Sequence, residues 1–337
     1  MTLQLDDIAL DPPVLLAPMA GITDLPMRRQ VARYGAGLVV SEMVASGEVV
    51  TRQPSARARA RMKADLGLDL GVPASVQLAG REARPMAEAA RVIAGMGARI
   101  IDINMGCPAK KVTGGLSGAA LMRDPDHALR LIEAVVGAVE VPVTLKMRLG
   151  WDATCLNAAD LARRAEAAGV RMLAVHGRTR AQFYTGRADW AAVGAVVKAV
   201  TIPVVVNGDI VDAATAGAAR RASGARGVMI GRAAQGAPWT LAQVMAGLHG
   251  RPAPAVPAGS ELFHRISDHY EDMLAFYGKD LGLRVARKHL GWYADRARFD
   301  PALRRALMTA NDPAQVRVLL RSACAGAPGP DDLGEAA

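Results

Sequence analysis

The chain has 337 residues, of which 51% are hydrophobic and only 4% are aromatic, so aliphatic side chains must build its core. Its 41 lysines and arginines exceed its 32 aspartates and glutamates, and the net charge of +9 favours a polyanionic partner unless it only reflects an arginine-rich composition. Three cysteines without a Cys-x-x-Cys pair exclude a disulfide scaffold and a structural zinc site, and they suit a reducing compartment.

Eight apolar, largely β-branched runs predict strands, and a helical pattern follows each of them. The strands are expected at 14–17, 37–42, 73–78, 99–104, 142–147, 171–176, 203–207 and 226–230. The helices are expected at 24–33, 52–63, 84–95, 125–139, 157–168, 189–200, 213–223 and 237–248. One strand–helix unit every 25 to 40 residues or so is typical of an α/β protein with a (β/α)8 TIM barrel, here over residues 1–249. No Gly-x-Gly-x-x-Gly motif supports a Rossmann site.

A proline-rich stretch at 250–259 indicates a linker between this barrel and a second domain. Four amphipathic patterns then predict a C-terminal helical domain over 260–325, with helices at 260–278, 281–297, 301–309 and 312–323. Residues 326–337, rich in Gly, Pro, Ala and acidic residues, are expected to form a flexible tail. We expect no signal peptide, because Met1–Asp7 lacks the basic and apolar segments, and no membrane span, because no apolar run approaches about 18 residues.

Polar residues and glycines gather where the predicted strands end, and in a barrel these ends face one site. In chain order they are Pro18-Met19-Ala20-Gly21, Glu42, Gln77, Asn104 with Cys107, Lys146 with Arg148, His176-Gly177-Arg178, Asn207-Gly208-Asp209 and Gly231-Arg232. The glycines after the seventh and eighth strands lie where barrels hold a phosphate. Lys146 and His176 can stabilise negative charge on an electron-rich ring, and Gln77 can read a ring edge. The set favours FMN over a dinucleotide.

Single members of this set have other readings. Cys107 follows the fourth strand in a loop that Gly106 frees and Pro108 stiffens, yet a lone cysteine can equally be an inert small hydrophobe. Lys146 can pair with Glu42 or serve as the Schiff-base lysine of a lyase. A single buried histidine is more often a core residue than a site residue. Cys155 and Cys324 are expected to be structural.

Taken in order, the motifs resemble the tRNA-dihydrouridine synthase family, bacterial B-type. The segments that carry the resemblance are Ala17–Asp24, Val76–Leu78, Asp102–Pro108, Leu145–Arg148, Val175–Arg180, Val206–Ile210 and Met229–Arg232. The resemblance spans about residues 10 to 300 and includes Arg287–Tyr293. It implies a barrel enzyme in which NADPH reduces FMN, the flavin passes hydride to C6 of a D-loop uracil of tRNA, and Cys107 protonates C5. It suggests position 17 as the target and implies no metal. We also expect a cytoplasmic monomer.

The resemblance further implies the roles of individual residues. Those implied to bind FMN are Pro18, Met19, Ala20, Gln77, Lys146, His176, Asn207, Gly208, Asp209, Gly231 and Arg232. Those expected to contact uridine or tRNA are Asn104, Lys110, Arg148, Arg178, Arg180, Arg287 and Lys288. The chemistry agrees, since the enolate formed by hydride addition needs a nearby protonated acid. A base within folded RNA must be extruded to reach a barrel mouth.

Three other functions stay open at this point. A flavin barrel acting on a free small pyrimidine or enone shares the same strand-end residues, although the basic charge and the helical domain speak against it. A Schiff-base lyase would use Lys146 without a flavin. A non-catalytic RNA-binding protein would not need so many polar groups at the strand ends.

Overall fold

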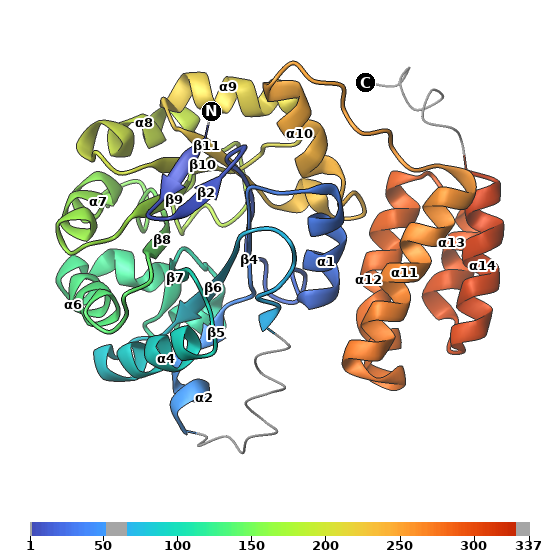
Figure 1. The fold of residues 1–337 in the computed structure, drawn as a ribbon, viewed down its shortest axis with the longest axis horizontal. Coiled ribbons are helices and arrows are strands. Elements are labelled where there is room, and N and C mark those ends of the chain that lie inside the picture. The colour runs from blue at the N-terminus through green and yellow to red at the C-terminus, as the bar shows by residue number, and fades with distance from the viewer. Residues whose placement is uncertain (1, 52–65, 328–337) are drawn as a thin grey trace.

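The computed structural model describes residues 2–51 and 66–327, and within these ranges eight parallel strands close into a barrel (Figure 1). The barrel strands are β3 (Val14–Leu16), β4 (Leu38–Val40), β6 (Ala74–Ala79), β7 (Ile101–Met105), β8 (Val143–Arg148), β9 (Met172–His176), β10 (Val204–Asn207) and β11 (Gly227–Ile230). Strand β4 pairs with β6 as well as with β3, which closes the ring of eight strands. The short β5 (Val44–Ala45) pairs with β6 beyond the end of β4. The predicted TIM barrel is therefore confirmed, with every strand boundary within two residues of its expected place.

Helices cover the outside of this barrel. They are α1 (Leu25–Tyr34), α2 (Ser46–Thr51), α4 (Ala83–Gly95), α6 (Pro125–Val136), α7 (Ala158–Ala167), α8 (Trp190–Ala199), α9 (Ala213–Ser223) and α10 (Thr240–Leu248). Shorter turns, α5 (Lys110–Thr113), η1 (Gly118–Arg123) and η2 (Arg232–Ala234), lie in the loops after β7 and β11. Aspartates at the N-caps of α1, α6, α8 and α9 accept a backbone N–H of the first turn. The expected helix at 52–63 lies outside the described residues.

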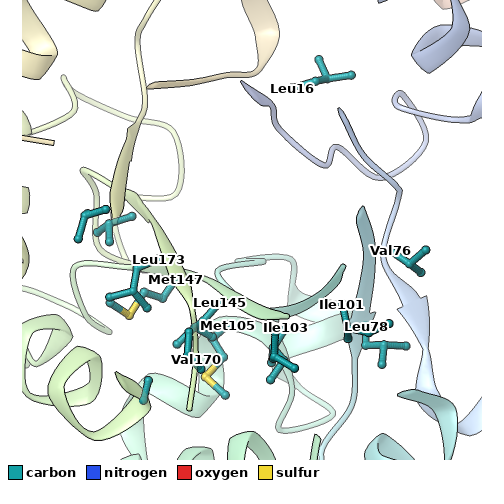
Figure 2. Packing of buried hydrophobic residues seen from close by; sticks show 14 of the residues in the cluster. Leu16, Val76, Leu78, Ile101, Ile103, Met105, Leu145, Met147, Val170 and Leu173 are labelled. Carbon is teal, nitrogen blue, oxygen red and sulfur yellow. The ribbon is translucent and has the colours of Figure 1, made fainter. Parts of the chain in front are cut away.

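Side chains alternate along each strand between the helix layer and the barrel interior. The outward set packs against the helices in one continuous core, and Figure 2 shows members of it from β6, β7, β8 and β9. The inward set forms two layers. The lower layer is apolar, with Leu15, Val40, Met172, Val205 and Met229 in one cluster. The upper layer is polar, and it ends at the carboxyl ends of the strands.

A small antiparallel hairpin closes the bottom of the barrel. Its strands β1 (Leu3–Leu5) and β2 (Ile8–Leu10) place Leu3, Leu5, Ile8 and Leu10 in the cluster formed by the lower barrel layer. This hairpin was not predicted from the sequence. The bottom is therefore plugged by apolar side chains, and the polar top is the only end of the barrel interior at which the described residues form a site.

Four helices make a bundle beside α1 (Figure 1). They are α11 (Gly259–Tyr277), α12 (Lys279–Arg296), α13 (Pro301–Thr309) and α14 (Pro313–Ala325), all within two residues of the expected bounds. They enclose a core of their own, and Trp239 of the barrel side joins it. The described segment 251–258 connects α10 to α11 without a helix or strand. No helix among the described residues is both long and apolar enough to cross a membrane.

Candidate active site

A cavity of about 630 Å³ opens at the carboxyl ends of the barrel strands. Every residue that the sequence assigned to a cofactor lines it, and so do three of those assigned to catalysis or substrate: Pro18, Met19, Ala20, Gln77, Asn104, Cys107, Lys146, Arg148, His176, Asn207, Gly208, Asp209, Gly231 and Arg232. Strand register explains the convergence, because Asn104 lies beside Lys146 while His176 lies between Arg148 and Asn207. Lys110, Arg178, Arg180, Arg287 and Lys288 do not line this cavity.

The loop that carries Cys107 is held by hydrogen bonds to both its backbone N–H groups and its backbone carbonyls. The side-chain oxygen of Asn104 accepts the backbone N–H groups of Gly106 at 3.1 Å and Cys107 at 3.0 Å. The guanidinium of Arg148 donates from Nε to the Gly106 carbonyl at 2.7 Å, and the Cys107 carbonyl accepts from Ala119 at 3.0 Å. The half-buried thiol is thus fixed at the cavity wall.

Behind that loop, buried polar side chains on three adjacent strands form one hydrogen-bonded chain. Thr144 Oγ1 donates to Asp102 Oδ1 at 2.6 Å, and Gln77 Nε2 donates to Asp102 Oδ2 at 2.6 Å. Asn104 Nδ2 then donates to Gln77 Oε1 at 2.7 Å. Burial raises the pKa of the Asp102 carboxyl, while its two donors act in the opposite direction. Sequence reasoning quoted Asp102 only as part of a motif, although its spacing of two from Asn104 places both on one strand face.

Lys146 places its ammonium group in the cavity. Nζ donates to Asn207 Oδ1 at 3.3 Å, and the amide of Asn207 in turn donates to the Met229 carbonyl at 2.8 Å. Burial, followed by the nearby Arg148 guanidinium, lowers the pKa of Lys146 to about 8. No ion pair joins Lys146 to Glu42 among the described residues, so the structural pairing considered from sequence is absent there.

His176, on the neighbouring strand β9, is held neutral. Burial and the cationic side chains around it lower its pKa to about 2. Arg178 Nη1 lies 3.3 Å from His176 Nε2, and since a guanidinium only donates, Nε2 accepts and the ring proton is on Nδ1. Gly208 packs against this ring: a Cβ atom there would lie 2.8 Å from His176 Cδ2, at a φ of +116° that favours glycine.

Arg178 and Arg148 are buried rather than presented to solvent. Arg178 makes two hydrogen bonds to Asp209, at 3.0 and 2.6 Å, and others to the carbonyls of Thr185 and Gly186. Arg148 donates to the carbonyls of Thr179 and Phe183 as well as to the Cys107 loop. Each is about 1% exposed. In this structure both therefore hold the loop after β9, and Arg148 also lines the cavity.

The remaining residues that the sequence assigned to RNA are spread over the molecule. Lys110 is exposed at the start of α5. Arg180 is half-buried, with its guanidinium 4.7 Å from the ring centre of Trp151. Arg287 donates to Asn311 inside the helical bundle at 2.6 Å. Lys288 donates to the carbonyl of Gly21, so it joins α12 to the loop between β3 and α1. Site residues after β11 and β3 thus lie against the bundle.

Two aromatic residues at the cavity were missed from sequence. Phe183 and Tyr184 are 42% and 47% exposed, which is unusual for large rings, and both line the cavity. Tyr184 lies with its ring centre 5.2 Å from the guanidinium carbon of Arg232 and 5.6 Å from that of Arg148. Two adjacent aromatics in a chain with so few were an available signal. The described residues contain no group of three or more His, Cys, Asp or Glu placed to hold a metal ion.

Comparison with known proteins agrees with this geometry. A family model described as "Dihydrouridine synthase (Dus)" matches residues 15–326. A probable tRNA-dihydrouridine synthase of Rhodobacter capsulatus is 68% identical over 323 residues, 96% of this chain and 98% of that one. tRNA-dihydrouridine synthase B of Pseudomonas putida is 47% identical over 281 residues, 83% of this chain and 82% of that one.

Among solved structures, a morphinone reductase mutant in complex with tetrahydroNAD shares the fold, with a TM-score of 0.55 and 15% identity. The match covers 77% of this chain and 93% of that one. Histamine dehydrogenase from Rhizobium sp. 4-9 matches with a TM-score of 0.56 at 12% identity, over 80% of this chain and 50% of that one. The family expected from the motifs is confirmed: the chain belongs to the dihydrouridine synthase family.

Proposed function

We propose that the protein is an FMN-dependent tRNA-dihydrouridine synthase that reduces a D-loop uridine with NADPH as the electron donor. The observation that carries the proposal is the convergence of Cys107, Lys146 and the glycine loops after β10 and β11 on one cavity. Membership of the family and the names of its relatives support the same reaction. The protein is proposed to act in the cytoplasm as a monomer, without a metal.

The cavity fits FMN by its donor set. Within the described residues, the backbone amides of Asp209, Arg232 and Ala233 donate to no other backbone group, and all three residues line the cavity. Free amides beside the half-exposed Arg232 suit a phosphate. The ammonium of Lys146 and the proton on His176 Nδ1 are donors that suit the electron-rich edge of a flavin ring. Pro18, Met19 and Ala20 supply an opposite wall, and Gln77, Asn207, Gly208 and Gly231 complete the lining.

The protein's own contribution to the chemistry is to orient and to protonate. FMN, when bound, supplies hydride to C6 of the uracil after reduction by NADPH. Lys146 and His176 favour the electron-rich state of the ring through a positive charge and a hydrogen-bond donor. Cys107 donates the proton of its thiol to C5, which requires the thiol to be protonated and fixed. Asn104 and Arg148 fix it by holding the backbone on either side of Gly106.

The substrate must enter as an extruded base. A cavity at a barrel mouth admits a single nucleotide but not a folded RNA stem, so the uridine must leave its stack. Phe183 and Tyr184 line the cavity and are partly exposed, and aromatic side chains of this kind suit stacking against bases. Lys110 and Arg180 lie on the Cys107 side of the mouth. Arg287 and Lys288 lie on the bundle side, where a domain over 260–325 is proposed to bind tRNA.

In this proposal residues 1–249 are the catalytic barrel, 250–259 the linker and 326–337 a flexible tail. The alternative, a flavin enzyme for a free pyrimidine or enone, has the same cavity but no use for the basic bundle. Comparing free uridine with tRNA as oxidant of the reduced protein separates the two. Oxidation by tRNA alone supports the proposal, and equal oxidation by free uridine contradicts it.

The acid assignment is tested with Cys107→Ala. Loss of a positioned general acid slows product formation by about 10²-fold or more, because proton transfer then depends on solvent. Dihydrouridine in tRNA from a deletion strain is measured by mass spectrometry after incubation with protein and NADPH. Cys155→Ala is the matched control and should form dihydrouridine at the wild-type rate. In Cys107→Ala itself, NADPH should still reduce the bound flavin at the wild-type rate. A wild-type yield from Cys107→Ala would rule out this role.

A further inference from the structure

In the chain of buried hydrogen bonds behind Cys107, the assignment of donors and acceptors can run in one direction only. At one end, the backbone N–H groups of Gly106 and Cys107 can only donate, so Asn104 must turn its oxygen toward them. At the other end, Asp102 Oδ2 accepts from Gln77 Nε2 at 2.6 Å, so Gln77 turns its nitrogen toward Asp102. The link between them, Asn104 Nδ2 to Gln77 Oε1 at 2.7 Å, then follows without choice.

We infer that Asp102 is a positioning residue whose carboxylate fixes the orientation of the Gln77 and Asn104 side-chain amides and, through Asn104, the position of the Cys107 loop. Asp102 does not itself line the cavity, and its carboxyl group bonds to Gln77 and Thr144 rather than to the loop. It lies two residues before Asn104 on β7 and opposite both Gln77 on β6 and Thr144 on β8. That register brings an acceptor to the one place from which both amides can be oriented.

Burial makes this arrangement consequential. Asp102 is 5% exposed, Gln77 1% and Asn104 7%, so water cannot replace a lost partner freely. An amide without a fixed partner can rotate by half a turn and exchange its donor and acceptor. Rotation of Asn104 would place its NH2 group against two N–H groups, and the loop would then shift. The consequence for catalysis rests on the proposed role of Cys107, whereas the position of the loop does not.

Substitutions at Thr144 test the orientation of the side-chain amides separately from the charge at position 102. In Asp102→Asn, the new amide can still turn its oxygen to Gln77 if its nitrogen donates to the Thr144 hydroxyl. Thr144→Val alone removes one donor from the carboxylate but leaves it an acceptor. In the combined variant Asp102→Asn with Thr144→Val, nothing fixes the new amide. We therefore expect the two changes to be strongly non-additive.

The measurement is the rate at which iodoacetamide alkylates Cys107, divided by the rate for Cys155 in the same purified protein. Cys155 is equally half-buried but lies in another loop, so the ratio removes any effect of general loosening. In the double variant, we expect the ratio to rise at least about fivefold beyond the product of the two single effects. The turnover number for dihydrouridine should fall by about tenfold or more while the KM for tRNA stays within about twofold.

The double variant Asp102→Asn with Thr144→Ser restores the hydroxyl and should return the ratio close to that of Asp102→Asn alone. The valine double variant could be insoluble while the serine double variant is soluble and has the alkylation ratio of Asp102→Asn alone. That result would also show that the hydroxyl at position 144 fixes the new amide. A ratio in the valine double equal to the product of the singles would overturn the inference. If the wild type made no dihydrouridine, the proposed function would fail, and the alkylation ratio would still decide this point.

Discussion

Among the cavity residues, Lys146 is the one whose charge state matters most for binding an electron-rich ring. Its ammonium is the group best placed to meet an electron-rich ring, yet burial and Arg148 lower its pKa from 10.5 to about 8. The lowered pKa means that Lys146 loses its proton at a lower pH than an ordinary lysine does. The charge is present below about pH 8 and is lost as the pH rises through that value.

We expect the affinity for FMN to weaken above about pH 8, by up to about tenfold per pH unit, because binding must then restore the proton to Lys146. Titrating the cofactor-free protein with FMN by fluorescence between pH 6.5 and 9.5 measures this slope. Lys146→Met should bind more weakly at pH 7 and show a flat profile. Lys198→Met, at an exposed position in α8, is the control and keeps the slope. The same slope in Lys146→Met would contradict the assignment.

Sequence reasoning found the cavity residues because strand ends in a barrel converge whatever their separation in the chain. It could not tell which side chains have groups free to meet a ligand and which make their hydrogen bonds within the protein. Arg148 and Arg178 were expected to contact tRNA, which stays a prediction, and the structure adds that their guanidinium groups donate to loop carbonyls and to Asp209. Asp102 was passed over because an acidic residue within an apolar strand shows its partners only when neighbouring strands are in place.

At the scale of elements, helix α9 shows how a cap can serve the site. Asp212 accepts from Thr215 N at 2.7 Å, and Thr215 Oγ1 accepts from the amides of Val211 and Asp212 at 3.0 Å. This reciprocal box ends the loop that follows β10, and four residues of that loop line the cavity, Gly208 to Val211. The helix itself is rich in alanine and ends at Gly224, whose φ is +72°.

We expect Asp212→Ala to lower the free energy of unfolding by about 1 kcal/mol, because the first turn of α9 loses its acceptor. Urea unfolding followed by circular dichroism measures the change. Asp212→Ser keeps an acceptor and should lose only a few tenths of a kcal/mol. Asp160→Ala, in the first turn of α7 but not at its cap, is the matched control. A larger loss in Asp160→Ala than in Asp212→Ala would count against the cap.

Elements with strong local signals were predictable, and those stabilised by distant partners were not. Strands β7 and β8 are apolar runs between a helix end and a polar loop, and they appear where expected. The β1–β2 hairpin was missed because three-residue strands carry little periodicity. Its leucines and isoleucine are buried only because the open bottom of the barrel receives them.

The arrangement of the whole molecule depends on the contacts that hold the helical bundle against the barrel. Two ion pairs join α1 to α11, Arg29 with Asp272 and Arg33 with Asp268, but all four side chains are at least one quarter exposed. Exposed pairs of this kind contribute little. A better-protected contact between the two is the hydrogen bond from Tyr277 to Asp24 at 2.8 Å. Within the bundle, a buried aromatic cluster around His269 joins α11 to α12.

His269 makes the helical bundle sensitive to acid. It is fully buried between Tyr293, which lies 3.1 Å from Nδ1, and His289, whose ring centre is 4.9 Å away, and Arg33 of α1 acts on it from the barrel side. Burial lowers the pKa of His269 to about 3 and also lowers that of His289. The unfolded chain, with histidine pKa values near 6.5, therefore binds more protons than the folded protein between about pH 6.5 and 3.

Stability is thus greatest above about pH 6.5 and falls as the pH drops, by up to about 1.4 kcal/mol per pH unit for each such histidine. In His269→Gln, an amide can still meet Tyr293, so the protein should fold but be less stable at pH 8, because the smaller side chain packs less well. Its free energy of unfolding should fall less steeply between pH 6.5 and 5, since one of the protonating groups is gone. Urea titrations at four pH values measure both effects, with His264→Gln at an exposed position as control. An unchanged slope in His269→Gln, or an equal flattening in His264→Gln, would show that acid acts elsewhere in the molecule.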